Sequence, residues 1–196
     1  MDTNKKLKNV LIISVICLAV STFLFSTSPF IFDIKVNNIK TTISNITKIS
    51  SYNWNEMIRA REEFLLGTQK SSENHIFILL NANKELVDRN VESIKFHLVS
   101  SVKILTTIVK GDALTKEEFY SFHKISIQDL ILLYRKNFDK AVIKYNNLNK
   151  STENLELKIL KIERLKNTVL IFAILVQLIG LFLGIYISIK TELKNN

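Results

Sequence analysis

Two long windows without a charged residue constrain the fold of this 196-residue chain more than any other feature of its sequence. No Asp, Glu, Lys or Arg occurs in the 24 residues between Lys8 and Asp33, or in the 23 residues between Lys166 and Lys190. An α-helix needs about 20 apolar residues to cross the hydrocarbon core of a bilayer, because each residue rises about 1.5 Å. Both windows reach this length, so each predicts a transmembrane helix.

The windows divide the chain into five parts and explain its composition, which is 47% hydrophobic and 23% charged. Between them lie no proline and only two glycines, Gly67 and Gly111, so long helices are favoured over strands with tight turns. We therefore expect an all-α membrane protein whose two transmembrane helices flank a long-helix antiparallel bundle or coiled-coil domain. The expected order is a cytoplasmic tail at residues 1–9, transmembrane helices at 10–32 and 168–189, a helical extramembrane domain at 33–167 and a short tail at 190–196.

The first window has a second interpretation, as a removable signal peptide. Three lysines among residues 5–8 precede it, and residues 26–28 are small enough for a cleavage site. Pro29 follows that site directly, and the apolar stretch is long for a signal peptide. We expect a retained membrane anchor, with cleavage as the alternative.

The Lys and Arg residues near the ends of the windows bear on orientation, because they are enriched on the cytoplasmic side of a membrane. Both tails are rich in lysine, and this density favours cytoplasmic termini with the domain outside. The expected location is a bacterial inner or plasma membrane. The opposite orientation stays open, because it would place the basic cluster from Lys158 to Lys166 against anionic lipid headgroups.

Apolar spacing predicts four helical segments in the middle domain. Gly67 and the polar residues 68–72 indicate the end of the first segment. Apolar residues at spacings of three, four or seven predict the second segment from Ile76 to Leu105. Lys110 and Gly111 then supply a basic last turn and a left-handed cap.

The third segment begins at a predicted capping box, in which Thr115 and Glu118 satisfy each other's backbone amides. The Asn-rich residues 146–149 predict a turn before the fourth segment, which then continues into the second window without a helix breaker. A turn near Ser126 and Asp129 is the alternative, because it makes the helical arms more equal in length.

Small and polar side chains form one stripe on the second window, at spacings of four, three, four and four. Such a stripe lets two helix backbones approach closely, and a Gln can hydrogen-bond across the contact. It predicts packing of the two spans with each other, or of two subunits in a homo-oligomer. The stripe comprises Ala173, Gln177, Gly180, Gly184 and Ser188, and Ser14, Cys17, Ser21 and Ser28 form a weaker stripe on the first window.

No motif in the sequence indicates an enzyme, a cofactor or a metal site. His75, His97 and His123 stand singly, without a Cys or a carboxylate at a ligand-like offset. The net charge of +9 is spread over many segments, so it does not predict nucleic-acid binding.

Arg59 and Arg61 are the candidate ligand contacts. A guanidinium grips a carboxylate in bidentate fashion, so either arginine suits an anionic small ligand in a helical interface. The simpler interpretation is that Arg59 pairs with Glu62 or Glu63 on a solvated helix surface. The two arginines lie about 200° apart around a helix, so one chain does not join them in a single clamp.

In its order of parts the chain resembles the four-helix-bundle sensory modules of bacterial chemoreceptors and sensor kinases. The resemblance covers residues 1–190, rests on topology and includes no motif, so it assigns no binding residues. It implies that the domain senses a ligand outside and shifts the second membrane helix. Only seven residues follow Ile189, where that family continues into an output domain, so a signal is expected to pass to a partner.

Two functional hypotheses follow. The first is a non-enzymatic two-pass membrane protein whose helical domain mediates sensing, self-association or the binding of a membrane or soluble protein partner. The second is an oligomerising membrane effector, which would permeabilise the bilayer as toxin-like or antiviral systems do.

Overall fold

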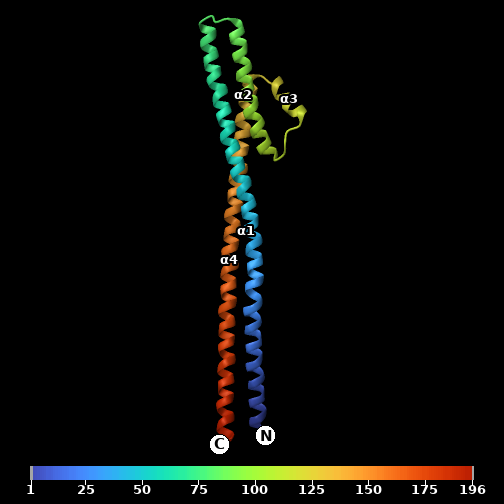
Figure 1. Cartoon of the computed structure of the whole chain (residues 1–196), viewed down its shortest axis with the longest axis vertical. Coiled ribbons are helices and arrows are strands. Elements are labelled where there is room, and N and C mark those ends of the chain that lie inside the picture. Colours follow the sequence, from blue (N-terminus) through green and yellow to red (C-terminus); the bar gives the residue numbers. More distant parts are fainter. Residues whose placement is uncertain (1, 196) are drawn as a thin grey trace. The chain divides into compact units, whose positions relative to one another are not determined.

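The computed structural model describes residues 2–195, and the side chains of residues 6–193 within that range. Every secondary-structure element in the described chain is a helix, so the all-α prediction is confirmed (Figure 1). Both α1 and α4 contain a stretch long and apolar enough to cross a membrane. The elements are α1 (Asp2–Leu79), α2 (Lys84–Lys110), α3 (Lys116–Lys124) and α4 (Ile127–Asn195).

The chain divides into two compact units. The span unit comprises Met1–Ile43 and Glu153–Asn196, and the core unit comprises Ser44–Thr152. The core unit is shorter than the expected domain at 33–167, because the unit is bounded by contacts between residues and the expected domain by the ends of the uncharged windows. Each unit is described separately.

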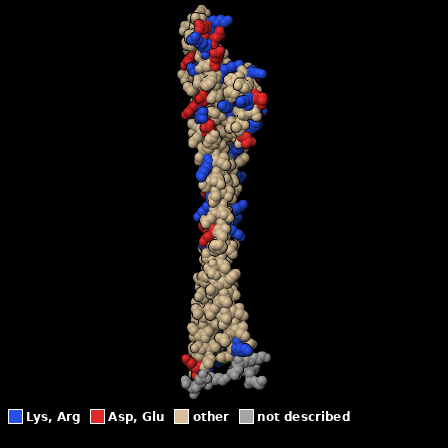
Figure 2. All heavy atoms as spheres, turned by 45° about the vertical axis from the view of Figure 1, so that its right-hand side comes forward, with Lys and Arg blue, Asp and Glu red and all other residues tan. Residues whose placement is uncertain are grey.

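In the span unit, α1 and α4 pair along a seam of heptad spacing. Covered positions on α4 alternate at steps of three and four residues, the pattern of a coiled coil. The covered positions on α1 include the small residues Ser14, Ser21 and Ser28, while large side chains such as Phe30 and Phe182 point outward. Figure 2 shows the uncharged belt that these outward side chains form. The α4 seam comprises Leu155, Ile159, Ile162, Lys166, Val169, Ala173, Val176, Gly180, Leu183 and Ile187.

Pro29 lies inside α1 without ending the helix. Proline has no amide N–H, so the carbonyl of Phe25 lacks its helical donor. Around this proline the covered positions Ser28, Phe32 and Val36 follow one another at two steps of four residues. Two such steps in succession interrupt a heptad pattern and locally unwind a supercoil.

The core unit contains four helical segments, but their bounds differ from those that the sequence predicts. Residues 44–79 of α1, helices α2 and α3, and residues 127–152 of α4 share one apolar core. Phe64 of α1 stacks on Tyr134 of α4 with ring centroids 3.9 Å apart. The core comprises Met57, Ala60, Ile94, Leu98, Val99, Val102, Ile104, Leu105, Ile108, Phe122, Leu130, Tyr134 and Ala141.

The predicted end of the first segment at Gly67 is wrong, because α1 runs on to Leu79. Gly67 is buried, and a Cβ atom there would lie 3.1 Å from Cγ of Leu98. This glycine therefore permits close helix packing and does not break the helix. The turn follows α1 instead, where Asn81 has a positive φ of 49° and Asn83 caps α2 by accepting a hydrogen bond from the Glu85 amide.

The predicted left-handed cap at Gly111 is confirmed. Its φ is 86°, and its amide donates to the carbonyl of Thr107 at 2.9 Å. Lys144 of α4 donates to the Ile108 carbonyl at 2.8 Å, which satisfies a further acceptor at this helix end. The end of α2 is thus held both by its own backbone cap and by a side chain of α4.

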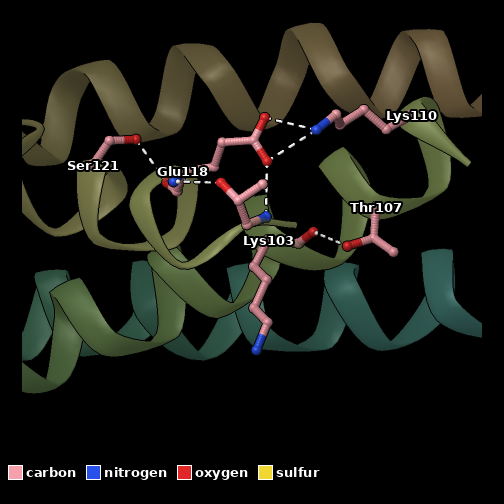
Figure 3. Close-up of polar contacts among 6 residues, drawn as sticks. Lys103, Thr107, Lys110, Glu118 and Ser121 are labelled. Carbon is pink, nitrogen blue, oxygen red and sulfur yellow. Dashed lines mark hydrogen bonds and ion pairs between the residues drawn. The ribbon is translucent and has the colours of Figure 1, made fainter. Parts of the chain in front are cut away.

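The predicted capping box of Thr115 and Glu118 is confirmed, although the helix it begins has only nine residues. Figure 3 shows Glu118 accepting hydrogen bonds from the Lys110 amine, at 2.7 and 2.9 Å, and from the Thr115 amide. The Lys110 amine, assisted by that amide, holds the pKa of the Glu118 carboxyl below its ordinary value. Glu118 therefore ties the end of α2 to the start of α3.

The alternative turn near Ser126 and Asp129 is confirmed, and the predicted turn at residues 146–149 is wrong. The Asp129 amide donates to Oγ of Ser126 at 3.1 Å as α4 begins. Asn149 lies inside α4 and accepts a hydrogen bond from Ser50 at 2.9 Å. An Asn side chain without a distant partner often bonds to the nearby backbone and favours a turn, whereas Ser50 occupies the side-chain oxygen of Asn149 here. As the sequence predicts, α4 continues through the second window without a break.

Candidate functional site

The two spans approach each other closely at Gly180. A Cβ atom built there would stand 3.1 Å from Cβ of Cys17 and 3.1 Å from Cγ of Leu18. Ser14 donates its hydroxyl hydrogen to the Gly180 carbonyl at 2.7 Å. Because a larger residue would fill this space, the glycine sets the separation of the helices.

The structure places three of the five stripe residues in this contact. Ala173 and Gly180 are buried, and a Cβ atom on Gly184 would lie 3.4 Å from Oγ of Ser14. Gln177 and Ser188 are exposed, and Val176 and Ile187 occupy the covered positions beside them. The covered positions of the α4 seam alternate at steps of three and four residues. The prediction chose small or polar residues, and it therefore missed Val176 and Ile187 by one position each. On α1 the weaker stripe lies along the seam, with Ser14, Ser21 and Ser28 buried and Cys17 half-buried.

An ion pair lies at one end of the paired spans. The Lys166 amine contacts the Asp33 carboxylate at 2.7 Å. These are the charges that bound the two windows on the side of the middle domain. Sequence reasoning did not pair them, although their equivalent positions at the two window ends are a usable signal. The pair joins α1 to α4 at this level.

Arg59 and Arg61 face different surroundings in the core unit. Arg59 is exposed and contacts Glu56, one turn before it, at 3.5 Å, and not Glu62 or Glu63, the partners one turn after it that the sequence suggested. Arg61 is also exposed. Burial raises the pKa of the Tyr134 phenol, and the charge of Arg61 opposes this rise. The structure does not bring the two arginines together, in agreement with their angular separation on a helix.

Arg59 lines a groove of about 560 Å³ in the core unit. Lys103 and Lys144 contribute further positive charge to its wall, and Glu56 and Asp112 contribute negative charge. Two of these groups already have partners, because Lys144 binds the end of α2 and Glu56 contacts Arg59. The mixed, partly satisfied charges give the groove no clear preference for an anion.

An uncovered apolar stripe runs along α1 in the core unit. Trp54, Ile58 and Leu65 recur at helical spacing, with 47%, 43% and 53% of their surfaces exposed. Arg61 lies on the same stripe, one turn beyond Ile58. The Trp54 ring lies 5.1 Å from that of Tyr145, which holds it beside α4. Tryptophan and arginine are the residues most enriched in the energetic centres of protein interfaces.

A second uncovered apolar cluster lies at the turn between α1 and α2. Leu79 and Leu80 are 80% and 73% exposed, higher than any other large apolar side chain of the core unit. Ile76, Ile78 and Leu86 are exposed beside them. A monomer in water gains nothing from displaying these side chains, so the cluster suits contact with an apolar surface.

The described side chains include no cluster of metal-ligating residues. In that part of the chain, His, Cys, Asp and Glu form no group of three that would hold a metal ion. His97 has a single carboxylate contact, to Glu63 at 2.8 Å. Comparison of the chain with models of protein families, with curated proteins and with solved structures finds no match.

Proposed function

We propose that this chain is a non-enzymatic, two-pass membrane protein whose helical domain self-associates and passes that event through α4 into the second span. In this proposal the spans flank an antiparallel helical bundle, and both termini are cytoplasmic. The partners are the bilayer and a second copy of the chain.

The uncovered stripe of Trp54, Ile58 and Leu65 supports this proposal most directly. The three side chains sit at the spacing that one helix presents to another, and each is more than two-fifths exposed although Trp54 also contacts Tyr145 of α4. Two copies that met on this stripe would bury three large apolar side chains on each side. Arg61 would lie at the same contact, where a planar guanidinium packs on an aromatic ring such as that of Trp54.

The continuity of α4 supports the second step of the proposal. One helix, Ile127–Asn195, carries core residues such as Leu130 and Tyr134 and also the seam of the second span. The seam contacts around Gly180 are small, and a hydrogen bond between membrane helices contributes about 0.6 kcal/mol on average. Contacts of this strength permit a change in helix packing when the domain associates.

Oligomeric state tests the proposal. We expect the purified full chain in detergent to form dimers or higher oligomers, and Ile58→Glu to weaken them by about 2 kcal/mol, or about thirtyfold. Light scattering after size exclusion, over a range of protein concentrations, measures the effect. Ile143→Glu is the matched control, because Ile143 is an exposed isoleucine on α4, away from the stripe.

The proposal fails if the wild-type chain is monomeric at tens of micromolar. It also fails if Ile143→Glu weakens association as much as Ile58→Glu does, since charge alone would then explain the loss. A monomer that binds a different protein through Ile58 would instead favour a heterologous partner over a second copy.

A second candidate function, perturbation of the bilayer, is favoured by the apolar cluster at the turn between α1 and α2. If Leu79 and Leu80 enter a membrane, induced expression is expected to depolarise cells. Leu79→Lys with Leu80→Lys should abolish this effect, because each lysine costs about 3 kcal/mol within the bilayer.

A potential-sensitive dye measures the depolarisation. Leu132→Lys is the control, because Leu132 is an exposed leucine on α4, outside the cluster. Unchanged membrane potential on expression of the wild-type chain argues against the effector, and so does equal protection by the control.

A further inference from the structure

A pocket between the tail ends of the two spans has a basic lining that the proposed function does not use. Its volume is about 380 Å³. Lysines from both helices line it, and no Asp or Glu is among the lining residues in the part of the chain whose side chains are described. The pocket therefore offers positive charge to whatever enters it. It is lined by Lys6, Leu7, Asn9, Val10, Tyr186 and Lys190.

The two helices contribute different hydrogen-bond donors. The Lys190 amine donates to the hydroxyl of Tyr186 at 2.8 Å, which holds it at the pocket. An ammonium group has three N–H donors, so two remain for a ligand. Lys6 is exposed on α1 and supplies a second ammonium group. Asn9 adds an amide that donates to an anionic oxygen.

The pocket lies where the charged tails meet the uncharged windows. Val10 begins the first predicted span, and Tyr186 lies one turn from the end of the second. Tyrosine is enriched at this level of membrane proteins because its ring suits the boundary between headgroups and acyl chains. Leu7 and Val10 are half-buried and form the apolar wall. The pocket thus combines donors for a phosphate with an apolar path for an acyl chain.

We propose that this pocket binds the phosphate group of an anionic phospholipid, with its acyl chains along Leu7 and Val10. Basic pockets between membrane helices bind such headgroups through lysine and arginine. The proposal rests on insertion of the two spans and not on self-association of the helical domain. Inorganic phosphate shares the charge of the headgroup but lacks the acyl chains, so the two sources are separable.

Lipid retention measured by native mass spectrometry tests the proposal. The full chain is released from mixed micelles that contain phosphatidylglycerol and phosphatidylcholine with identical acyl chains. We expect selective retention of phosphatidylglycerol. Lys6→Gln with Lys190→Gln should reduce it about 25-fold, since each lysine near anionic lipid contributes about fivefold.

Lys8→Gln is the matched control, because Lys8 is exposed on the same tail and does not line the pocket. Equal loss in this control would mean general attraction between charges and would overturn the proposal. Equal retention of the two lipids by the wild-type chain would do the same. Ile58→Glu should keep the preference for phosphatidylglycerol, which separates this test from that of self-association.

A competition with inorganic phosphate distinguishes the two sources of the anion. We expect millimolar phosphate to leave the bound phosphatidylglycerol in place, because only the lipid also contacts Leu7 and Val10. Displacement of the lipid by phosphate at equal concentration would assign the pocket to a free anion and overturn the lipid proposal.

Discussion

Gly180→Ile is expected to separate α1 from α4 where their two uncharged windows pack. An added side chain would meet Cβ of Cys17 and Cγ of Leu18, both 3.1 Å from the first atom it introduces. Overpacking of this kind costs about 1–3 kcal/mol, and the hydrogen bond from Ser14 to the Gly180 carbonyl would be strained as well. We expect the helix axes to move apart by about 2 Å, within the usual range set by contact side chains.

Spin labels at Lys8→Cys and Glu192→Cys, in a Cys17→Ser background, measure this separation by pulsed electron resonance. Both positions are exposed, one on each helix of the span unit. Gly184→Ala is the control, because its Cβ atom would lie an ordinary 3.4 Å from Oγ of Ser14. An unchanged distance distribution in Gly180→Ile would contradict the packing described here.

Leu105→Ala is expected to destabilise the core unit by about 3 kcal/mol. Leu105 is fully buried within the core, so truncation removes apolar contacts and leaves a cavity among α1, α2 and α4. Trp54 is the single tryptophan of the chain and lies in this unit, so its fluorescence follows unfolding by denaturant.

Leu132→Ala provides the comparison for Leu105→Ala. Leu132 is 57% exposed on α4, and truncation there should change the free energy of unfolding by less than about 0.5 kcal/mol. Similar losses of unfolding free energy in the two variants would contradict the assignment of Leu105 to the buried core.

Much of the fold follows from the sequence, because its strongest signals are local. The two uncharged windows, the cap at Gly111 and the capping box of Thr115 and Glu118 each depend on residues within a few turns of one another. The errors arose where a distant residue decides the outcome. The helix runs through Gly67, where the missing side chain leaves room for Leu98 to pack against it. Asn149 stays within a helix, where its side-chain oxygen accepts a hydrogen bond from Ser50.

The candidate sites follow the same rule. Gly180 was identified from its spacing, because a close helix contact requires a small residue wherever it occurs. The sequence does not reveal that Val176, and not Gln177, faces α1, because this depends on the angle at which the two helices pack. The pairing of Asp33 with Lys166 and the pocket at Lys6 and Lys190 join opposite ends of the chain, which no local pattern encodes.

If the two windows cross a bilayer as proposed, the ion pair between Lys166 and Asp33 also bears on how the second span can move there. A shift of α4 by one turn, about 5.4 Å, toward the tails would carry the Lys166 ammonium into hydrocarbon and separate it from Asp33. A shift the other way would draw Lys190 away from its headgroup level. The span is therefore held at one depth from both ends, which leaves rotation or tilt about the seam, and not piston displacement, as its accessible motion.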